Sequence, residues 1–263
     1  RWIGRMRFSY HIVIPARFDS QRLPGKPLLD IAGKSLIQRV YECALQSDAD
    51  TITVATDSQQ IFEAVEGFKG VVCMTRNDHL SGTDRVAEAT QLLGLAEDAL
   101  VLNLQGDEPL VSPVLINQVA RTLVDTPDAM ISSACCPIES LEEYQNPNVV
   151  KVVRNQQRLA AYFSRAPIPW MRDEGSSVHS SMHWSDTRRH LGIYAYSVGY
   201  LKRFCELSPA PTELTEKLEQ LRALWHGDAI VVCDASEVPG PGVDSPQDLR
   251  RVVEYFESLP ATG

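Results

Sequence analysis

The sequence lacks any apolar run of about 18 residues or more, which is the length that a membrane-spanning helix needs. Its first ten residues, RWIGRMRFSY, also lack the long apolar segment of a signal peptide. We therefore expect a cytoplasmic protein that does not enter a membrane. We also expect residues 1–6 to form an N-terminal extension outside the fold.

Positive charge is scarce, with 25 Lys and Arg against 34 Asp and Glu, which gives a formal net charge of −9. A general affinity for nucleic acid or for an anionic membrane is therefore not expected. The six cysteines lack any CxxC spacing, and most of them lie in apolar runs. We interpret them as reduced thiols of the core rather than as ligands of a zinc site.

Both common phosphate-binding glycine motifs, GxGxxG and the Walker A loop, are missing. Three cations nevertheless lie close together in IPARFDSQRLPGKPL, namely Arg17, Arg22 and Lys26, directly after an apolar run. Gly25 would let the backbone approach an anion closely. A loop that follows a strand of a parallel sheet lies at the edge where α/β folds bind ligands. A polyphosphate is the expected ligand, and a solvated basic turn is the alternative.

Short β-branched runs alternate with amphipathic stretches, which is typical of βαβ units and a mostly parallel sheet. The predicted strands of the first half are residues 10–15, 51–56, 70–75, 99–105 and 129–138. Helical spacing of apolar residues follows each of the first four strands. Ser112 and Pro113 give one of these helices an N-cap and a first residue.

The pattern changes near residue 145, where residues 148–165 predict two strands joined by a polar turn. We expect one domain over residues 8–260, with 145–190 as an inserted hairpin and loop region. The polar stretch 171–188 fits either a lid or a plain connection. Then come a predicted strand at 190–197, a helix at 212–225, a strand at 229–235 and a last helix capped by Ser245, Pro246 and Asp248.

The loop IPARFDSQRLPGKPL resembles the signature loop of the CMP-sugar-acid synthetases, most closely the branch that acts on 3-deoxy-manno-octulosonate (Kdo). The likeness continues, in the family's order, through MTRNDHLSGTDRVAEA, NLQGDEPL, NPNVVKVV, YFSRAPIPW, RHLGIYAY, LEQLRALWHGD and VPGPGVDSPQDL. It covers roughly residues 12–253. The resemblance implies a doubly wound α/β fold like that of nucleotide-diphospho-sugar transferases, and a homodimer formed through the inserted hairpin.

The reaction that the resemblance implies is the transfer of CMP from CTP to Kdo, with release of pyrophosphate, for lipopolysaccharide synthesis. Arg17, Arg22 and Lys26 match triphosphate-binding positions of the family. Three further residues match the cytosine and ribose pocket: Arg76, Ser81 and Gly82. Ser81 and Gly82 also fit a helix-start turn, and the two interpretations are compatible. His79 alone is more typical of ordinary surface.

Chemistry at a triphosphate requires a hard cation such as Mg²⁺, which prefers oxygen ligands. The resemblance makes Asp107 and Asp244 its ligands, and makes them catalytic together with Arg17 and Lys26. Taken alone, an aspartate at a strand exit is more often a turn or cap residue. Glu108 is a neighbour of this site and a weaker candidate.

A sugar acid needs a fixed cation for its carboxylate and polar groups for its hydroxyls. By resemblance Arg165 would hold the carboxylate, and the other sugar-binding positions are Gln105, His190, Tyr194, Glu219 and Gln220. Without the resemblance, Glu219 and Gln220 would indicate a solvated helix face, and His190 a core histidine. The open alternatives are 8-amino-Kdo or a sialic acid as acceptor, a hexose-1-phosphate nucleotidyltransferase, and a nucleotide-binding module without catalysis.

Overall fold

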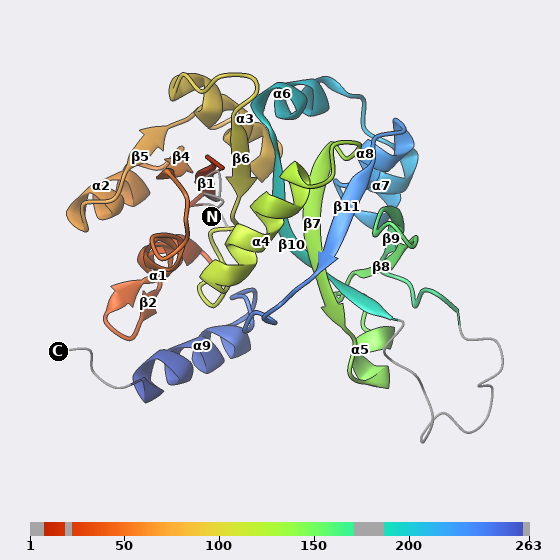
Figure 1. Cartoon of the computed structure of the whole chain (residues 1–263). Coiled ribbons are helices and arrows are strands. Elements are labelled where there is room, and N and C mark those ends of the chain that lie inside the picture. The colour runs from red at the N-terminus through yellow and green to blue at the C-terminus, as the bar shows by residue number, and fades with distance from the viewer. Residues whose placement is uncertain (1–7, 19–22, 171–186, 260–263) are drawn as a thin grey trace, which may run out of the picture.

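A single mixed sheet with helices on both faces forms the centre of the computed structural model, which describes residues 8–18, 23–170 and 187–259 (Figure 1). Within these residues the sheet has nine strands, seven of them in the order β11, β7, β10, β6, β1, β4, β5. β8 and β9 form a hairpin beside β10. The predicted α/β class is confirmed.

The first half of the chain builds the parallel part of the sheet. β1 (His11–Ala16) lies between β4 (Thr51–Thr56) and β6 (Leu100–Asn103), and β5 (Val72–Met74) pairs with the outer edge of β4. The crossover helices are α1 (Leu36–Ala44), α2 (Gln59–Gly67) and α3 (Gly82–Leu92). Because the paired strands run parallel, their carboxyl ends meet at one edge of the sheet, and the loops that leave them lie together there.

The second half contains the antiparallel strand β10 (Arg188–Ser197), which runs between β6 and β7 (Ile131–Pro137). β11 (Ile230–Asp234) is parallel to β7 and closes that side. The predicted hairpin is confirmed as β8 (Lys151–Arg154) and β9 (Ala160–Ser164), and it joins the sheet through the pairing of Lys151 with Arg189. The prediction of a separate inserted region at 145–190 stays a prediction.

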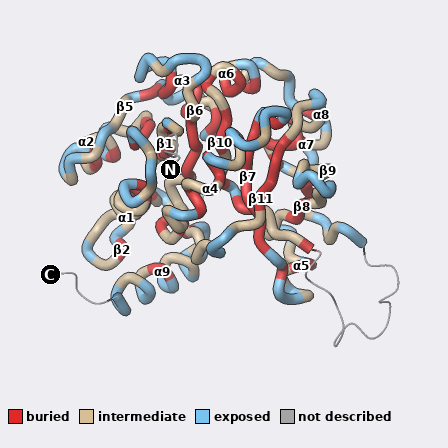
Figure 2. The backbone as a smooth tube through the Cα atoms, viewed as in Figure 1, coloured by how far each residue is buried: buried red, intermediate tan, exposed pale blue. Residues whose placement is uncertain are grey.

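Two clusters of buried apolar side chains pack against the sheet and its helices, so the predicted doubly wound arrangement is confirmed. Figure 2 shows the buried residues concentrated along the central strands. One core cluster lies under α1, α2, α4 (Pro113–Val124) and α9 (Pro246–Ser258). The other lies under α3, α6 (Val198–Glu206) and α8 (Leu221–Trp225). β1, β4, β6, β7 and β11 are buried along most of their length, as their continuous apolar runs indicate, whereas β5 at the edge has no fully buried residue.

The predicted caps of two helices are confirmed. Ser112 and Ser245 cap α4 and α9, and Asp248 completes the capping box of α9. The single helix predicted over 212–225 is wrong: α7 (Pro211–Glu216) ends at Lys217, whose φ of 55° is left-handed, and α8 begins at Leu221. Apolar spacing alone did not show this break because residues on both sides of it are buried.

Several short elements complete the described part: η1 (Lys26–Leu28), β2 (Asp30–Ile31), β3 (Lys34–Ser35) and α5 (Leu141–Gln145). All six cysteines are free thiols, as expected. Within the described ranges, no helix has the length and apolar character needed to cross a bilayer. The predicted extension at 1–6 and most of the polar stretch 171–188 lie outside the described residues.

Candidate functional site

The loop after β1 turns sharply at Gly25 and directs Lys26 back toward the sheet. Gly25 has a φ of 66°, and a Cβ there would also touch the ring of Phe18 at 3.4 Å. The turn is held by backbone hydrogen bonds from Gly25 N to Phe18 O and from Lys26 N to Leu23 O. Glycine is therefore the residue that adopts this turn with the least strain.

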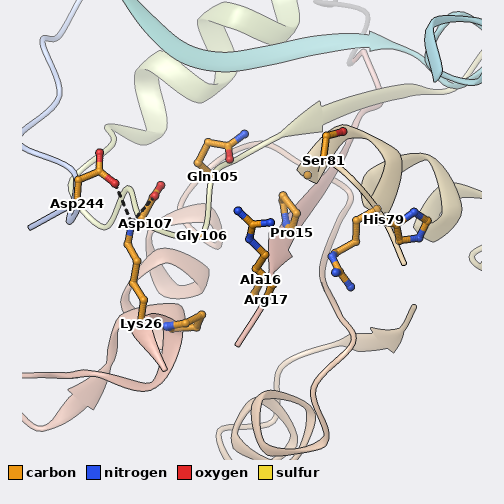
Figure 3. Close-up of a pocket in the computed structure, with 13 residues that line it drawn as sticks. Pro15, Ala16, Arg17, Lys26, His79, Ser81, Gln105, Gly106, Asp107 and Asp244 are labelled. Carbon is orange, nitrogen blue, oxygen red and sulfur yellow. Dashed lines mark hydrogen bonds and ion pairs between the residues drawn. The ribbon is translucent and has the colours of Figure 1, made fainter. Parts of the chain in front are cut away.

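Lys26 brings together two carboxylates that are far apart in the sequence (Figure 3). Its Nζ lies 2.6 Å from Oδ2 of Asp107, which follows β6, and 2.9 Å from Oδ1 of Asp244, which precedes α9. A hydrogen bond of 2.9 Å from Val243 N to Asp107 O joins the two loops directly. The predicted proximity of these three side chains is thus present in the structure.

The charges in this cluster support one another. Burial alone would lower the pKa of Lys26, but the adjacent Asp107 and Asp244 outweigh burial and raise it. The ammonium therefore stays protonated at neutral pH. Glu108 differs, because burial and the charges of Asp107 and Asp244 raise the pKa of its carboxyl to about 8. A carboxyl with that pKa is largely protonated at pH 7.

These side chains form one end of a cavity of about 380 Å³ at the carboxyl edge of the parallel strands. We call this the charged end, and it consists of Lys26, Asp107 and Asp244 (Figure 3). The opposite end lies at the start of α3, and we call it the helix end: His79, Ser81, Gly82 and Arg85. Between the two ends, Gly106 allows its backbone to approach that of Pro15 closely, since a Cβ at position 106 would lie 3.0 Å from Pro15 O.

The sequence-predicted nucleotide residues fall at both ends of this cavity. Lys26 lies at the charged end and Arg17 between the two ends, while Ser81 and Gly82 line the helix end (Figure 3). Ser81 is also the N-cap of α3, in a reciprocal capping box with Asp84. Arg76 lies on the loop before Ser81 with an exposed side chain, 3.2 Å from Asp78. Arg22 lies outside the described residues.

Two lining residues with charged or titratable side chains were not predicted from the sequence. Arg85 is 3% exposed, and its guanidinium donates to Asp57 Oδ2 at 2.6 Å. His79 was interpreted as ordinary surface, which is wrong: its side chain is 6% exposed and lies 2.5 Å from Glu88 Oε2. The spacing of Arg85 and Glu88 puts both on one face of α3, but it does not show that this face contacts the loop that carries His79.

Four predicted sugar-binding residues are connected to the cavity directly or through their neighbours: Gln105, His190, Tyr194 and Glu219. Gln105 lines the cavity itself, and Glu219 accepts a hydrogen bond from the hydroxyl of Thr83, in the first turn of α3. The rings of His190 and Tyr194 are 5.4 Å apart, and burial followed by the charge of Glu219 raises the pKa of Tyr194. The Tyr194 hydroxyl and the Glu219 carboxyl are therefore close enough for the charge of one to affect the other.

His190 is packed between aromatic rings and has a fixed hydrogen-bond partner. Its Nε2 is 2.9 Å from Ser133 Oγ, and its ring meets that of Phe163 edge on at 4.9 Å. Burial lowers the pKa of His190 to about 3, so the ring is neutral at physiological pH. A neutral imidazole can exchange hydrogen bonds with a hydroxyl but supplies no charge.

Arg165 and Gln220 are more deeply engaged in the protein than the sequence indicates. The Arg165 guanidinium donates to Glu216 O at 2.6 Å and to Pro147 O at 2.9 Å. Gln220 is 7% exposed and is the N-cap residue of α8. A second cavity of about 540 Å³ adjoins the first, and Gln105 and Asp244 line both. His190 and Glu108 line the second cavity.

The charged end has the donors that a magnesium ion requires. Asp107 and Asp244 converge on a single cation, the Lys26 ammonium, so their carboxylates are already directed at one point. Two carboxylates completed by phosphate oxygens are a typical Mg²⁺ environment. Among the described residues, no cluster of three or more His, Cys, Asp or Glu side chains could hold a metal by itself. The residues therefore fit a hard ion that a phosphate ligand brings with it.

The chain resembles known proteins along most of its length. A family model described as Cytidylyltransferase matches residues 11–230. A 3-deoxy-manno-octulosonate cytidylyltransferase of Coxiella burnetii is 47% identical over 248 residues, which is 94% of this chain and 100% of that protein. The protein of the same description from Pseudomonas fluorescens is 50% identical over 254 residues, covering 96% and 100%.

Solved structures agree with the sequence comparison. A CMP:2-keto-3-deoxy-manno-octonic acid synthetase complexed with CTP superimposes with a TM-score of 0.85 at 41% identity, covering 95% of this chain and 98% of that one. A cytidylyltransferase from Leptospira borgpetersenii reaches a TM-score of 0.59 at 12% identity, covering 96% and 88%. At that identity the second likeness concerns the fold alone.

Proposed function

This chain belongs to the cytidylyltransferase family, and we propose that it transfers CMP from CTP to the anomeric hydroxyl of Kdo, giving CMP-Kdo and pyrophosphate. The identity of 47% to 50% with Kdo cytidylyltransferases over nearly the whole chain supports this acceptor. The observation that carries the chemistry is the meeting of Lys26, Asp107 and Asp244 at one end of the cavity. The product would serve lipopolysaccharide synthesis.

The reaction consists of one displacement at phosphorus. The anomeric oxygen of Kdo attacks the α-phosphorus of CTP in line, the bond from that phosphorus to the bridging oxygen breaks, and pyrophosphate leaves. Because negative charge is redistributed over phosphate oxygens, the protein mainly has to align the reactants and neutralise charge. Arg17, Arg22 and Lys26 supply that positive charge, and an Arg fork can hold two phosphate oxygens at once.

Asp107 and Asp244 would hold Mg²⁺ at the charged end. When bound, the ion neutralises phosphate charge and lowers the pKa of a hydroxyl that coordinates it. Lys26 is then free to turn from the carboxylates to the phosphates. The charged end thus needs both carboxylates to bind the ion and a lysine that can exchange one set of anionic partners for another.

The acceptor would lie beside Gln105, toward His190, Tyr194 and Glu219. These side chains offer hydrogen bonds to sugar hydroxyls, and the neutral His190 is suited to that task. Burial raises the pKa of Glu219, against the effect of its hydrogen bond from Thr83, and its carboxyl group offers a hydrogen-bond partner to a sugar hydroxyl. The assignment of Gln220 to the sugar and of Arg165 to its carboxylate stays a prediction.

A homodimer is part of this proposal. β9 lies at the outer edge of its hairpin, and large apolar side chains are exposed at Trp170, Leu214 and Trp225. An open strand edge and exposed apolar groups favour association with another copy. Sedimentation equilibrium should give twice the mass of one chain, and a single-chain mass at micromolar concentration would contradict this. The cytoplasmic location stays a prediction as well.

The test of the proposed function is pyrophosphate release from CTP and Mg²⁺. Parallel reactions contain Kdo, 8-amino-Kdo, N-acetylneuraminate or no sugar. Release with Kdo alone would support both the reaction and the acceptor. Release with only another sugar would keep the reaction and change the substrate. No release in any reaction would favour the non-catalytic nucleotide-binding module.

A further inference from the structure

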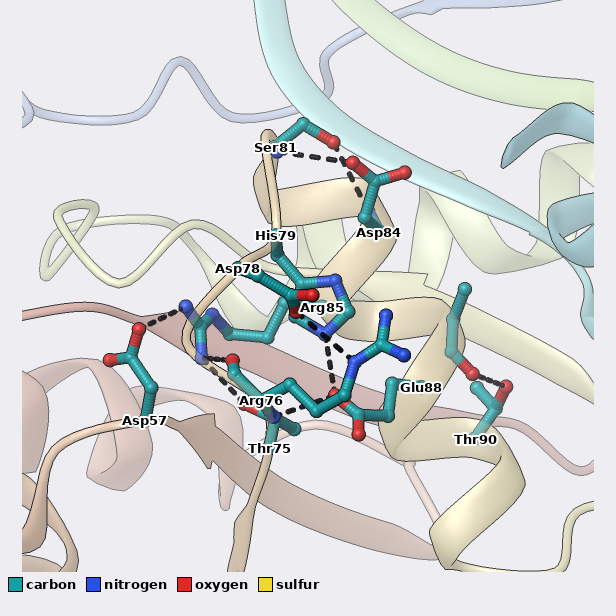
Figure 4. A network of polar contacts seen from close by, with 11 residues as sticks. Asp57, Thr75, Arg76, Asp78, His79, Ser81, Asp84, Arg85, Glu88 and Thr90 are labelled. Atoms are coloured by element: carbon teal, nitrogen blue, oxygen red, sulfur yellow. Dashed lines mark hydrogen bonds and ion pairs between the residues drawn. The ribbon is translucent and has the colours of Figure 1, made fainter. Parts of the chain in front are cut away.

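The loop Thr75–Ser81 forms one wall of the helix end, and it is held from behind by two side chains of α3 (Figure 4). Arg85 and Glu88 are three residues apart, so they lie on the same face of the helix. Both reach toward the loop and bind its backbone or side chains. The loop therefore takes its shape from contacts with α3 as well as from its own turns.

Glu88 makes two contacts with the loop through one oxygen. Its Oε2 accepts a hydrogen bond from Arg76 N at 2.9 Å and lies 2.5 Å from His79 Nε2. The Glu88 side chain is 20% exposed and that of His79 only 6%. Burial would raise the pKa of Glu88, but the contacts with His79 and Arg76 outweigh burial and lower it. The carboxylate is thus charged and held by the loop at neutral pH.

Arg85 fixes the beginning of the same loop. Its Nη1 donates to Thr75 Oγ1 at 2.5 Å and to Arg76 O at 3.4 Å, while Nη2 is paired with Asp57. Arg85 also lines the cavity, so it is able to touch a bound ligand directly. Glu88 stands behind the loop, outside the set of described residues that line the cavity. Any effect of Glu88 on binding must therefore act through the loop.

We propose that Glu88 is a positioning residue that sets the shape of the loop Thr75–Ser81, and through it the affinity for CTP and the preference for CTP over UTP. The inference rests on the proposed function, because it takes CTP as the ligand. With the triphosphate at the charged end, the base would lie toward the helix end, which is lined by His79, Ser81, Gly82 and Arg85. The loop that Glu88 holds is the wall next to that base.

Cytosine and uracil differ at one edge, where an amino donor replaces a carbonyl acceptor. A site discriminates between such groups only if its own donors and acceptors cannot turn to suit the wrong base. Glu88 prevents Arg76 N and the His79 side chain from turning. Loss of its carboxylate frees both, so the loop can adapt to uracil and must be ordered again when it binds cytosine.

The experiment is direct calorimetric titration of CTP and of UTP with Mg²⁺ and no acceptor. Glu88→Leu should weaken CTP binding by about tenfold or more and should reduce the ratio of CTP to UTP affinity. Glu88→Gln should stay within about threefold of the wild type, because its carboxamide oxygen can take the place of Oε2 and accept hydrogen bonds from both Arg76 N and His79 Nε2. Glu88→Ala removes the same carboxylate without adding an apolar side chain, and replaces Glu88→Leu if that variant does not fold.

Glu143 provides a matched control far from this loop in sequence. Its side chain is 19% exposed and also accepts one backbone N–H, from Glu139 at 3.0 Å, and one cationic group, Arg189 Nη1 at 3.0 Å. Glu143→Leu should lower the melting temperature as Glu88→Leu does while leaving the affinities for CTP and UTP unchanged. Equal losses of CTP affinity in both variants would mean general destabilisation and would overturn the proposal.

Two other results bear on the proposal in distinct ways. If Glu88→Leu binds CTP and UTP as the wild type does, the positioning role is wrong. In turnover assays with Kdo, Glu88→Leu should raise the KM for CTP while kcat changes less than about threefold, because Glu88 touches no reacting atom. A wild type that binds CTP without releasing pyrophosphate would contradict the proposed function and leave the binding result on Glu88 intact.

Discussion

The two ends of the cavity use charged residues in opposite ways. At the charged end the side chains of Lys26, Asp107 and Asp244 face the cavity and one another, and that of Asp244 is 70% exposed. At the helix end the charged groups of Arg85 and Glu88 pair with other protein groups and hold a loop, although Arg85 also lines the cavity. The charged end would act on a ligand through its own side chains. The helix end would act largely through the loop whose backbone and side chains Arg85 and Glu88 hold in place.

This difference predicts different consequences of mutation. A residue that faces the ligand contributes to turnover and adds little to stability, because its partners in the free protein are exchanged on binding. A residue that fixes a loop contributes to stability and to ground-state binding. The predictions below test this contrast, beginning with the largest expected effect.

Asp107→Asn and Asp244→Asn should each lower kcat at least about 1,000-fold, because each removes a charged oxygen ligand of Mg²⁺. Both variants should keep the wild-type melting temperature within a few degrees, since both carboxylates are partly exposed. Pyrophosphate release and thermal unfolding measure the two quantities. Near-normal turnover in either variant would remove that aspartate from the site.

Lys26→Met should lower kcat/KM for CTP about 100-fold, because a phosphate-binding cation is lost. The same change should strengthen the binding of Mn²⁺, used as a probe, to the protein without nucleotide. In the free protein the Lys26 ammonium is paired with both carboxylates, so its removal makes both of them available to coordinate the ion. Electron paramagnetic resonance of free Mn²⁺ measures this affinity, and weaker binding in the variant would contradict the exchange of partners.

The charged end was largely predictable from the sequence, and the helix end only in part. Lys26 and Asp107 follow strands whose exit loops lie at one edge of the sheet, but their roles and that of Asp244 were expected only from the family resemblance. Ser81 was visible because a capping residue has a local signature. Glu88 was not found, because an acidic residue within an amphipathic helix is usually a solvated one, and only its distance to Arg76 N shows otherwise.

Arg165 and the break at Lys217 show the same limit. The backbone carbonyls that hold Arg165 belong to Pro147 and Glu216, residues from two segments far apart in the chain. No local pattern of residues tells that these carbonyls are near the guanidinium. No glycine or proline in the sequence marks the end of α7, where Lys217 has a left-handed backbone conformation. Both features depend on tertiary contacts, which residue periodicity does not contain.

Asp57→Asn tests the helix end as a structural unit. It leaves the Arg85 guanidinium, which is 4% exposed, without its charged partner. The free energy of unfolding should fall by about 3 kcal/mol, since a buried cation that loses its carboxylate is strongly destabilising. Denaturant unfolding at pH 7 measures this, with Asp125→Asn as the control, because the Asp125 pair with Arg121 is more than half exposed. Equal, small effects in the two variants would mean that the buried pair adds no stability.

The smallest expected effect is the loss of stability at the helix end as the pH falls. The pKa of Glu88 is lowered in the folded protein from the usual 4.5, so its charged form stabilises the fold above about pH 4.5. That contribution is lost as the pH falls through the lowered pKa. Charged or titratable groups around Glu88 are His79 and Arg76 of the loop, Arg85 of α3 and Cys73 of β5.

Glu88→Gln has no carboxyl to protonate, so its free energy of unfolding should decline less steeply below pH 4.5 than that of the wild type. Asp107→Asn removes a carboxyl from the charged end instead, and the pH dependence of its free energy of unfolding is measured for comparison. Urea unfolding at half-unit pH steps between 6 and 3.5 would show the difference in slope. Parallel curves for the wild type and Glu88→Gln would mean that the loop holds the carboxyl and the carboxamide equally well, and that the charge of Glu88 adds nothing to the hydrogen bonds it makes.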